Sequence, residues 1–328
     1  MSASAPKFSL LLATLNEERR LPVLIESIRR QRYPRECVEI VIADGGSTDA
    51  TVRIAREAGC AVYDNPVVRC EPGIAIALSK ATGDLAVVMA ADNPFHDEDF
   101  LTNLAKPFAD PEIAAAFPML VNTAEDSATT RYFNAFTDPF NHFLYGSAAS
   151  PASYHRTYRI KKRTPDYVVY DFQAGPVPLI GLAQAFTLRL PYAKPEGTDE
   201  DDLVPVEMLI EAGKQIAYVP AALVEHHTVG GIGAALRKYA PRFRVRLRDP
   251  EQPLWQRSRG WNSGKRVRAY LWPFYSMSFV FPCFVSLYGL AVDRRIEWLY
   301  HPFVSAAFGY EFWKQFLTFV WQRVAGRK

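Results

Sequence analysis

Short apolar runs alternate with helical segments through the first third of the chain, and this order constrains the fold more than any other feature. Buried strands are predicted at 8–15, 38–43, 60–63 and 85–90, where continuous apolar runs have the length of strands. Helices are predicted at 49–58, which ends at Gly59, and at 74–80 and 97–108. Strands and helices alternating at this spacing predict a mainly parallel sheet covered by helices on both faces. The expected fold class is therefore α/β.

Polar residues follow the carboxyl ends of three of these strands, which is the edge where open α/β sheets bind ligands. Each cluster taken alone is also typical of a simple turn, in which glycines relax the backbone and Ser, Thr or Asp caps the next helix. Their recurrence at successive strand ends favours a binding site, in which Asp44 would accept a hydrogen bond from a base N–H. The three clusters are Thr14/Asn16/Glu17, Asp44-Gly45-Gly46-Ser47-Thr48-Asp49 and Asp92-Asn93.

The segments that carry these clusters resemble the family 2 inverting glycosyltransferases of the GT-A fold. The resemblance covers residues 8–248, through LLATLNEE, EIVIADGGSTDATVRIA, ATGDLAVVMAADN, DEDDLVPVEMLIEAGKQIAYVP, VEHHTVGG and RKYAPRFR. It implies a GT-A (Rossmann-like) sheet and the inverting transfer of a sugar from a UDP- or GDP-linked donor. It also implies a set of nucleotide-sugar-binding residues: Thr14, Asn16, Glu17, Asp44, Gly45, Ser47, Arg69, Asp92 and Arg242.

The Asp-x-Asp metal motif of that family is incomplete in this chain. Asp92 matches its last carboxylate, but Ala90 stands where the first would be. Mg²⁺ or Mn²⁺ prefers oxygen ligands and balances the charge of a diphosphate. The resemblance therefore implies a divalent metal held by Asp92, with help from His226 or His227. Adjacent residues on a strand point to opposite faces, so we expect at most one of the two histidines at the site.

The acidic run at 199–202 is the candidate catalytic centre. Acids in the first turn of a helix also suit the helix dipole, which is the structural alternative. An inverting transfer needs a carboxylate that removes the proton of the acceptor hydroxyl, and crowded acids raise one another's pKa toward the useful range. The family pattern, counted back from Gly213, implies Asp202 as the base and Asp201 as the alternative. A phosphate acceptor would need no base, and the run would then orient the substrates.

The composition of the chain changes near residue 265. All six tryptophans lie in the last 74 residues, and 237–268 carries a net charge of +9 against −6 for the rest of the chain. No charged side chain occurs between residues 269 and 292. We therefore predict a catalytic domain at 1–265 and an aromatic, hydrophobic helical region at 266–328.

The charge-free segment is long enough for a bilayer, because its 24 residues would cover about 36 Å as a helix and the hydrocarbon core is about 30 Å thick. Pro273 and Pro282 argue against one straight helix, and basic flanks on both sides favour the cytoplasmic face for both ends. A monotopic or re-entrant anchor fits these features better than a span, and 299–324 suits a helix lying in the interface. The alternative is a helical subdomain that packs on the catalytic domain or forms an oligomer interface.

Several other classes fit the sequence less well. A net charge of +3 gives no field for nucleic acid. Cys37, Cys60, Cys70 and Cys283 are too scattered for a zinc knuckle or a disulfide framework, which suits a reducing cytosol, and no signal peptide is recognisable. A nucleotidyltransferase would carry a Gly-rich phosphate loop where NEERRLP stands.

We therefore expect a glycosyltransferase that moves a sugar to a lipid-linked, polyprenyl-type acceptor at the cytoplasmic face of the cell membrane. Its partners would be a nucleotide sugar, the lipid-linked acceptor and the membrane, with no nucleic acid. One alternative is a catalytically silent, membrane-bound nucleotide-sugar-binding protein. Another is a soluble glycosyltransferase whose C-terminal helices form an oligomer interface. A second basic aromatic stretch, 154–163, is either a solvated loop or a clamp for an acceptor phosphate.

Overall fold

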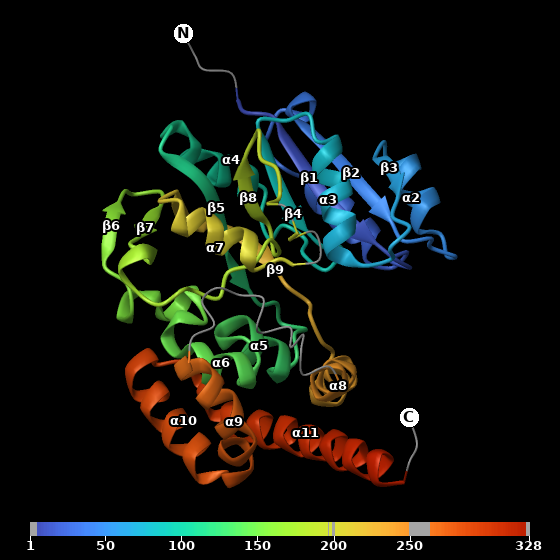
Figure 1. The fold of residues 1–328 in the computed structure, drawn as a ribbon. Helices are drawn as coiled ribbons and strands as arrows, with labels where there is room; N and C mark the ends of the chain where they lie inside the picture. The colour runs from blue at the N-terminus through green and yellow to red at the C-terminus, as the bar shows by residue number, and fades with distance from the viewer. Residues whose placement is uncertain (1–4, 196, 199–200, 249–262, 326–328) are drawn as a thin grey trace. The chain divides into compact units, whose positions relative to one another are not determined.

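The computed structural model describes residues 5–195, 197–198, 201–248 and 263–325 of the 328-residue chain (Figure 1). These residues form two compact units. The first, here called the sheet unit, comprises the described residues within 1–121, 158–175 and 180–226. The second, the helical unit, comprises the described residues within 122–157, 176–179 and 227–328.

A mixed sheet of nine strands forms the centre of the sheet unit (Figure 1). Its strands are β1 (Phe8–Thr14), β2 (Val38–Asp44), β3 (Ala61–Asp64), β4 (Leu85–Met89), β5 (Ile113–Val121), β6 (Ile160–Arg163), β7 (Val168–Tyr170), β8 (Phe186–Arg189) and β9 (Gln215–Glu225). They follow the order β3-β2-β1-β4-β8-β5-β9-β7-β6. The strands β1 to β4 are parallel to one another, as are β5 and β9, whereas β8, β7 and β6 run antiparallel to their neighbours.

The four strands predicted from apolar runs correspond to β1–β4, so the α/β class is confirmed. The mainly parallel arrangement holds for this half of the sheet, where strand–helix alternation is regular, and gives way to mixed pairing from β8 onward. The helices of this unit are α1 (Leu21–Arg29), α2 (Thr51–Glu57), α3 (Cys70–Lys80), α4 (Phe100–Ala105) and α7 (Val204–Glu211). Among them, α3 begins at Cys70 rather than at 74, because Pro72 is compatible with a first helical turn.

Strand register brings the polar clusters to one edge of the sheet. Thr14 at the end of β1 pairs with Asp44 at the end of β2, and Leu12 pairs with Met89 at the end of β4. The antiparallel strand β8 begins at this same edge, since its first residue, Phe186, pairs with Val88. The carboxyl edge of β1, β2 and β4 is therefore shared by the segment that precedes β8.

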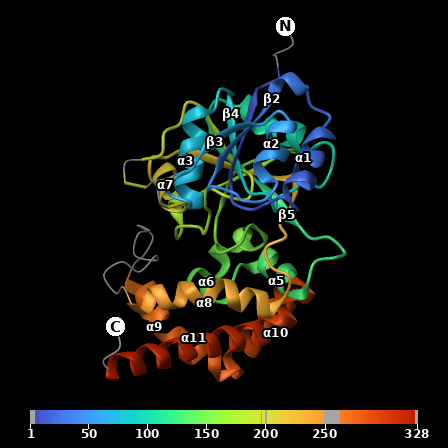
Figure 2. The same cartoon turned by 90° about the vertical axis from the view of Figure 1, so that its right-hand side faces the viewer.

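Six helices make up most of the helical unit: α5 (Ala128–Phe136), α6 (Pro139–Tyr145), α8 (Ile232–Arg248), α9 (Ser263–Ser278), α10 (Val280–Asp293) and α11 (His301–Val324). Figure 2 shows α11 alongside α8, and α11 also contacts α6, α9 and α10. One apolar cluster joins α5 and α6 to the C-terminal helices, through Tyr132, Phe133, Phe136, Phe140, Trp272, Trp298 and Phe308. The compact units therefore do not divide at the predicted boundary near residue 265, because residues 122–157 share a core with the C-terminal helices.

The charge-free segment is bent. Helices α9 and α10 meet at Phe279, whose φ of 56° lies in the left-handed region and interrupts the helix, and Pro282 follows in the first turn of α10. In the part of the chain that the structure describes, no single helix is long and apolar enough to cross a membrane. Residues 267–278 and 280–293 reach the required apolar length only as a pair, bent by 92°.

Candidate functional site

The loops after β1 and β2 are joined through the Asp44 carboxylate. Its Oδ1 accepts hydrogen bonds from the hydroxyls of Thr14 (2.8 Å) and Ser47 (2.6 Å). Its Oδ2 accepts from the backbone N–H groups of Gly46 (2.9 Å) and Ser47 (2.7 Å). Burial acts to raise the pKa of Asp44, but these bonds outweigh it and lower the pKa. An ionised Asp44 thus orders this loop, and its contact with a base N–H stays a prediction.

A second set of bonds closes the two loops on each other. The backbone N–H of Asn16 donates to Ser47 Oγ (2.8 Å), and Asn16 Oδ1 accepts from the N–H of Thr48 (2.9 Å). Glu17 N–H donates to Thr51 Oγ1 (2.7 Å). Burial raises the pKa of the Glu17 carboxyl, against the nearby Arg20, and Asp92 adds to the rise. The three residues predicted after β1 therefore lie beside the Asp44 loop, and Glu17 is within electrostatic reach of Asp92.

The loop from β3 to α3 covers the same region. Backbone and Cγ1 atoms of Val68 lie so close to Gly45 that a Cβ there would be 3.3 Å from Cγ1. Val68 itself has a φ of 61°, which is strained for a β-branched residue. Arg69 follows at the N-terminus of α3, where its guanidinium lies 3.8 Å from the Glu71 carboxylate. Gly45 and Arg69 thus belong to the same edge of the sheet as Asp44.

Asp92 lies in a loop that ties β4 to β9. The N–H of Ala90 donates to Asn93 Oδ1 (3.1 Å), and Asn93 Nδ2 donates to the backbone oxygen of Glu225 (3.3 Å). The N–H of Glu225 in turn donates to Pro94 O (3.0 Å). The half-buried Asp92 therefore lies in a loop held close to the end of β9, and His226 is the first residue after that strand.

The structure gives Asp201 and Asp202 different environments. Asp201 Oδ1 accepts from the backbone N–H groups of Leu203 (2.8 Å) and Val204 (2.9 Å), the residue before α7 and its first residue. The Asp202 carboxyl instead lies under Gly181, where an added Cβ would be 3.0 Å from its Oδ2. Burial, together with the charges of Asp201 and Glu71, raises the pKa of Asp202 to about 6. Of the two candidates, Asp202 has the protonation behaviour of a general base near neutral pH. Residues 199 and 200 of the acidic run lie outside the described residues.

Three residues that sequence reasoning missed share this environment. Glu71 raises the pKa of Asp202, whereas Lys194 lowers it, and Lys194 Nζ donates to Asp201 O (2.9 Å). Cys70 is an exposed residue, but local desolvation of its thiol and the carboxylates of Glu71, Asp202 and Asp92 raise the pKa of that thiol to about 11. Cys70 therefore stays a thiol within electrostatic reach of Asp92 and Asp202, the carboxylates predicted for metal and base. Pro72 was the available signal, because it is compatible with a helix that starts at Cys70, beside Arg69.

The adjacent histidines have different partners, as expected for neighbouring residues of an extended segment. His226 Nδ1 lies 3.3 Å from Gln184 Nε2 in the sheet unit. His227 Nδ1 lies 2.9 Å from Asp126 Oδ1 in the helical unit. Arg242 is an exposed residue of the helical unit, and its guanidinium lies 4.9 Å from the ring of Tyr239. His226 thus lies in the sheet unit together with Asp92, whereas His227 and Arg242 lie in the helical unit.

The candidate metal ligands of the protein are too few to hold a divalent cation without other ligands. Among the described residues, no three His, Cys, Asp or Glu side chains come together as metal ligands. Asp92 is the one carboxylate left of the Asp-x-Asp motif, and Ala90 supplies no ligand. A hard divalent cation takes six or more oxygen ligands, most of which would have to come from a donor diphosphate and water.

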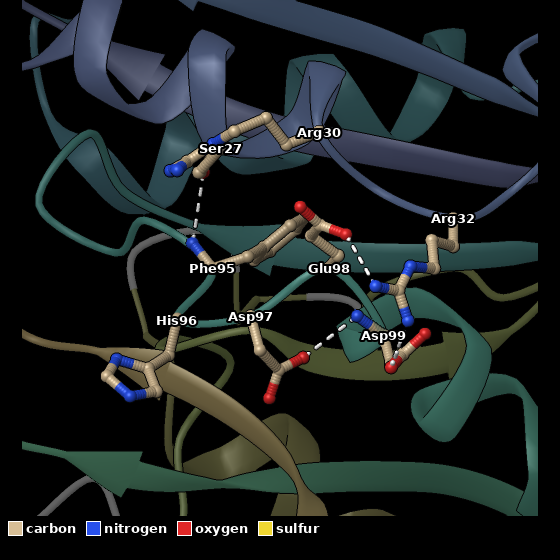
Figure 3. A pocket seen from close by; sticks show the side chains of 8 residues that line it. All are labelled: Ser27, Arg30, Arg32, Phe95, His96, Asp97, Glu98 and Asp99. Atoms are coloured by element: carbon tan, nitrogen blue, oxygen red, sulfur yellow. Dashed lines mark hydrogen bonds and ion pairs between the residues drawn. The ribbon is translucent and has the colours of Figure 1, made fainter.

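A separate polar pocket lies on the sheet unit (Figure 3). Arg32 pairs there with Glu98 (2.9 Å) and Asp99 (3.4 Å), and Phe95 N–H donates to Ser27 Oγ (3.0 Å). None of the predicted site residues lines this pocket, and its ion pairs already neutralise much of its charge.

The basic stretch 154–163 is divided between the units. Its last four residues form β6, the fully exposed edge strand of the sheet, where Lys162 pairs with Asp110 (2.6 Å). Arg159 pairs with Asp171 (2.9 Å), whereas Arg156 pairs with Asp293 in the helical unit. This stretch is therefore neither a free loop nor a single clamp. The charged residues of β6 also protect the edge of the sheet from pairing with other chains.

Part of the chain is similar to a known protein family. Residues 9–170, just under half of the chain, match the family described as Glycosyl transferase family 2. A "PGL/p-HBAD biosynthesis glycosyltransferase" of Mycobacterium tuberculosis is 32% identical over 108 residues, which are 31% of this chain and 41% of that protein. A "Dolichyl N-acetyl-alpha-D-glucosaminyl phosphate 3-beta-D-2,3-diacetamido-2,3-dideoxy-beta-D-glucuronosyltransferase" of Methanococcus voltae is 29% identical over 102 residues, 29% of this chain and 32% of that protein. The matches thus span less than half of these relatives.

A solved structure shares the fold over a longer range. The "Mannosyltransferase PcManGT from Pyrobaculum calidifontis in complex with GDP-Man and Mn2+" is 16% identical, with a TM-score of 0.54 over 96% of this chain and 88% of that one. At this identity the likeness is one of fold, and it agrees with the GT-A-type α/β architecture.

Proposed function

We propose that this chain, which carries a Glycosyl transferase family 2 domain at residues 9–170, is an inverting glycosyltransferase that uses a nucleotide sugar. The domain and the named relatives support a glycosyltransferase enzyme. The observation that carries the mechanism is the half-buried Asp202, whose carboxyl has a pKa raised to about 6, beside the loops of the carboxyl sheet edge. An acid with this pKa is largely ionised at neutral pH and still basic enough to accept a proton.

In the proposed reaction Asp202 removes the proton of the acceptor hydroxyl as the hydroxyl oxygen attacks the anomeric carbon. The bond between that carbon and the diphosphate oxygen breaks, and its electron pair leaves with the nucleoside diphosphate. Attack from the face opposite the leaving group inverts the anomeric configuration. Should the acceptor be a phosphate, it is already ionised, and Asp202 would orient it instead.

The nucleotide would lie against the loops after β1 and β2. We assign Thr14, Asn16, Glu17 and the Asp44 loop to the nucleoside, and Arg69 to the diphosphate. Polar groups of these loops are already ordered by mutual hydrogen bonds, which lowers the entropy lost on binding. Either UDP or GDP is compatible with this assignment.

A divalent metal would neutralise charge on the leaving diphosphate, and Asp92 is the carboxylate that would meet it. The residues present do not fit a site that holds the cation without the donor, because Ala90 removes one ligand and no cluster of three forms among the described residues. We therefore derive no step of the reaction through a metal.

The helical unit supports a lipid-linked acceptor at a membrane surface. Large apolar side chains of the bent pair α9–α10 are exposed, among them Phe281 (62%), Phe284 (65%), Leu287 (60%) and Tyr288 (65%). Helix α8 in the same unit exposes a basic face with Arg237, Lys238, Arg242 and Arg244. Exposed apolar side chains and exposed cationic side chains in one unit are the chemistry that binds an anionic lipid leaflet. We propose monotopic or re-entrant attachment at the cytoplasmic face, where the head of a polyprenyl-type lipid would be the acceptor.

The test compares Asp202→Asn with Asp201→Asn in the full-length chain. We expect Asp202→Asn to lower the rate of sugar transfer by about 10²–10⁴-fold while nucleotide affinity is kept. Asp201→Asn is the matched control, since the side-chain oxygen of asparagine can accept the same two backbone hydrogen bonds, and we expect it to leave most activity. Sugar transfer at the wild-type rate by Asp202→Asn to a hydroxyl acceptor would contradict the assignment.

A catalytically silent nucleotide-sugar-binding protein is the second candidate, and Ala90 favours it. Such a protein would bind UDP or GDP in a thermal-shift screen, because a ligand of the folded state raises its melting temperature. It would release no nucleoside diphosphate from any nucleotide sugar in the presence of lipid acceptors. Measured release from wild type would exclude it.

A further inference from the structure

Two histidines of the helical unit lie side by side, away from the site described above. His301, the first residue of α11, is fully buried, and His142 of α6 is half-buried. Their ring centroids are 5.3 Å apart, and the ring of Trp298 lies 5.1 Å from His142 and 5.6 Å from His301. The ring of Phe136, in α5, lies 6.3 Å from His142. The two imidazoles are therefore packed against each other and against aromatic rings from separate elements.

The hydrogen bonds of His301 join three helices. Its Nδ1 lies 2.6 Å from the hydroxyl of Tyr132 in α5, and its Nε2 lies 2.9 Å from the hydroxyl of Tyr275 in α9. A neutral imidazole has one donor and one acceptor nitrogen, and a hydroxyl can take either role. Neutral His301 therefore satisfies both contacts, whichever nitrogen carries the proton, and connects α5, α9 and α11.

Charged groups near the two histidines oppose a positive imidazole. The guanidinium of Arg156 pairs with the carboxylate of Asp293, the last residue of α10, and that carboxylate also accepts from an indole N–H (2.7 Å). The Asp138 carboxylate accepts from two backbone N–H groups at the start of α6 (3.0 Å each). A second cation, Arg268 of α9, donates to a backbone oxygen of α6 (3.3 Å). Both carboxylates are therefore already engaged, and a charged His142 would be repelled by Arg156.

These surroundings keep both imidazoles neutral in the folded unit. Local desolvation and the charge of Arg156 lower the pKa of His142 to about 4. Burial and the neighbouring His142 hold the pKa of His301 well below its usual range. In an opened unit both rings would instead take up protons near pH 6.5. The stability that the neutral rings contribute is therefore present above pH 6.5 and is lost as pH falls toward 4.

We propose that His142 and His301 form a pH-sensitive switch, which keeps the helical unit closed while both rings are neutral and opens it when acid charges them. A positive charge on either ring disfavours a charge on the other in the closed unit, so opening takes up two protons and depends steeply on pH. His142 alone should raise the ratio of open to closed units about 30-fold between pH 8 and pH 5, and His301 should multiply this effect. The inference goes beyond the proposed transfer reaction, which involves neither histidine.

Hydrogen exchange of backbone amides, detected by mass spectrometry, follows the opening of each unit separately. In the full-length protein, peptides of α6 and α11 should open at least 30-fold more often at pH 5 than at pH 8, after correction for the intrinsic exchange rate. Peptides of β1 and β4 in the sheet unit should show no such rise, because acid stabilises that unit through Asp202.

The variants remove the protonation sites and keep the packing. His142→Phe keeps an aromatic ring, and His301→Gln keeps a donor and an acceptor for the two tyrosine hydroxyls. We expect the double variant to lose most of the pH dependence of α6 and α11. His155→Gln is the matched control, because His155 is an exposed histidine of the same unit, and this variant should respond to pH as wild type does.

Nuclear magnetic resonance of histidine-labelled wild type gives a second measurement that needs no variant. The rings of His142 and His301, assigned through the proximity of their protons to those of Trp298 and Tyr132, should both be neutral at pH 5.5. A ring of this pair that is charged at pH 6 in the folded protein would overturn the inference. So would opening of α6 and α11 that differs less than threefold between pH 8 and pH 5, equal opening of both units in acid, or a wild-type pH response in the folded double variant.

Discussion

At the scale of single residues, the neighbouring carboxylates of Asp201 and Asp202 have different roles because different groups surround them. The Asp201 carboxylate accepts hydrogen bonds from backbone N–H groups at the start of α7. The Asp202 carboxyl instead packs against Gly181, which has no side chain and therefore allows this close approach. Leu182 N–H also donates to Asp202 O (2.8 Å), which holds the two segments together. The surroundings of the proposed base therefore come from a contact between two loops and not from the helix that follows it.

Asp202 should make stability and activity respond to pH in opposite directions. Its pKa is about 6 in the folded chain, above the ordinary value of 3.8, so the folded state binds the proton more tightly than the unfolded state does. The stability that the proton contributes is present below pH 3.8 and is lost as pH rises through about 6. Above that pH an ionised Asp202 should lower the free energy of unfolding by an amount of the order of 3 kcal/mol.

Thermal melting of Asp202→Asn measures this effect. We expect the variant to melt at a higher temperature than wild type at pH 8 and at the same temperature near pH 4, because asparagine mimics the protonated acid. The rate of wild-type transfer should rise with pH through about 6 and then level off. A stability difference that is the same at both pH values would show that the raised pKa is not its cause.

The sequence could predict which residues end the parallel strands, but not which loops fold over them. Thr14, Asp44 and Asp92 follow apolar runs, and register then aligns them at one edge. Gln184, Lys194 and the Cys70-Glu71 pair come from connections whose path depends on tertiary packing. Such residues follow no sequence periodicity. For the part of the site around Asp202, the sequence therefore predicted only the acidic run itself.

At the scale of elements, glycines allow the helices of the helical unit to pack closely. A Cβ on Gly289 of α10 would lie 2.2 Å from the Trp298 ring, and one on Gly309 of α11 would lie 2.3 Å from Ser276 Oγ of α9. Trp298 is itself fixed, because its Nε1 donates to Asp293 Oδ2 (2.7 Å) and its ring lies 4.1 Å from that of Phe136. The contact therefore couples α10 to α5, an element far away in the sequence.

Gly289→Ala should destabilise the helical unit strongly. The new methyl group overlaps a buried ring that has no room to move, and overpacking of this kind costs about 1–3 kcal/mol or more. The matched control is Gly230→Ala in the same unit, where an added Cβ meets no atom within 4 Å. Denaturant titration should give a lower midpoint for Gly289→Ala than for Gly230→Ala. Equal midpoints would contradict the packing of Trp298 against α10.

The bend between α9 and α10 was predictable, because prolines at 273 and 282 oppose a straight helix. Its position at Phe279 was not, since a left-handed φ at a bulky residue follows from packing and not from local preference. The shared core of α5, α6 and the C-terminal helices was also beyond the sequence. Composition shows where the kinds of residue change along the chain, but it does not show which segments pack together. The structure groups 122–157 with 227–328 by their contacts.

At the scale of the whole molecule, this grouping determines how membrane attachment can be tested. Removing all residues after about 265 would strip the cover from the Tyr132, Phe133 and Phe136 side chains of α5, which are buried against the C-terminal helices. A truncated chain would aggregate through this surface, so loss of membrane binding would carry no information. Point substitutions on exposed residues leave the core intact and are the better test.

The double variant Phe281→Asp/Phe284→Asp should release the protein from lipid. Both side chains are more than half exposed on α10, and burial of each in a bilayer would contribute about 2 kcal/mol, so their loss should weaken binding to vesicles at least 10²-fold. Val23→Asp is the matched control, because it makes the same kind of change at a 58% exposed residue of the sheet unit and should leave binding unchanged. Co-sedimentation with vesicles that contain anionic lipid measures the difference. If the double variant instead converts an oligomer to a monomer while the wild type stays in the supernatant, the apolar patch is an interface between copies of this chain and the proposed lipid attachment is wrong.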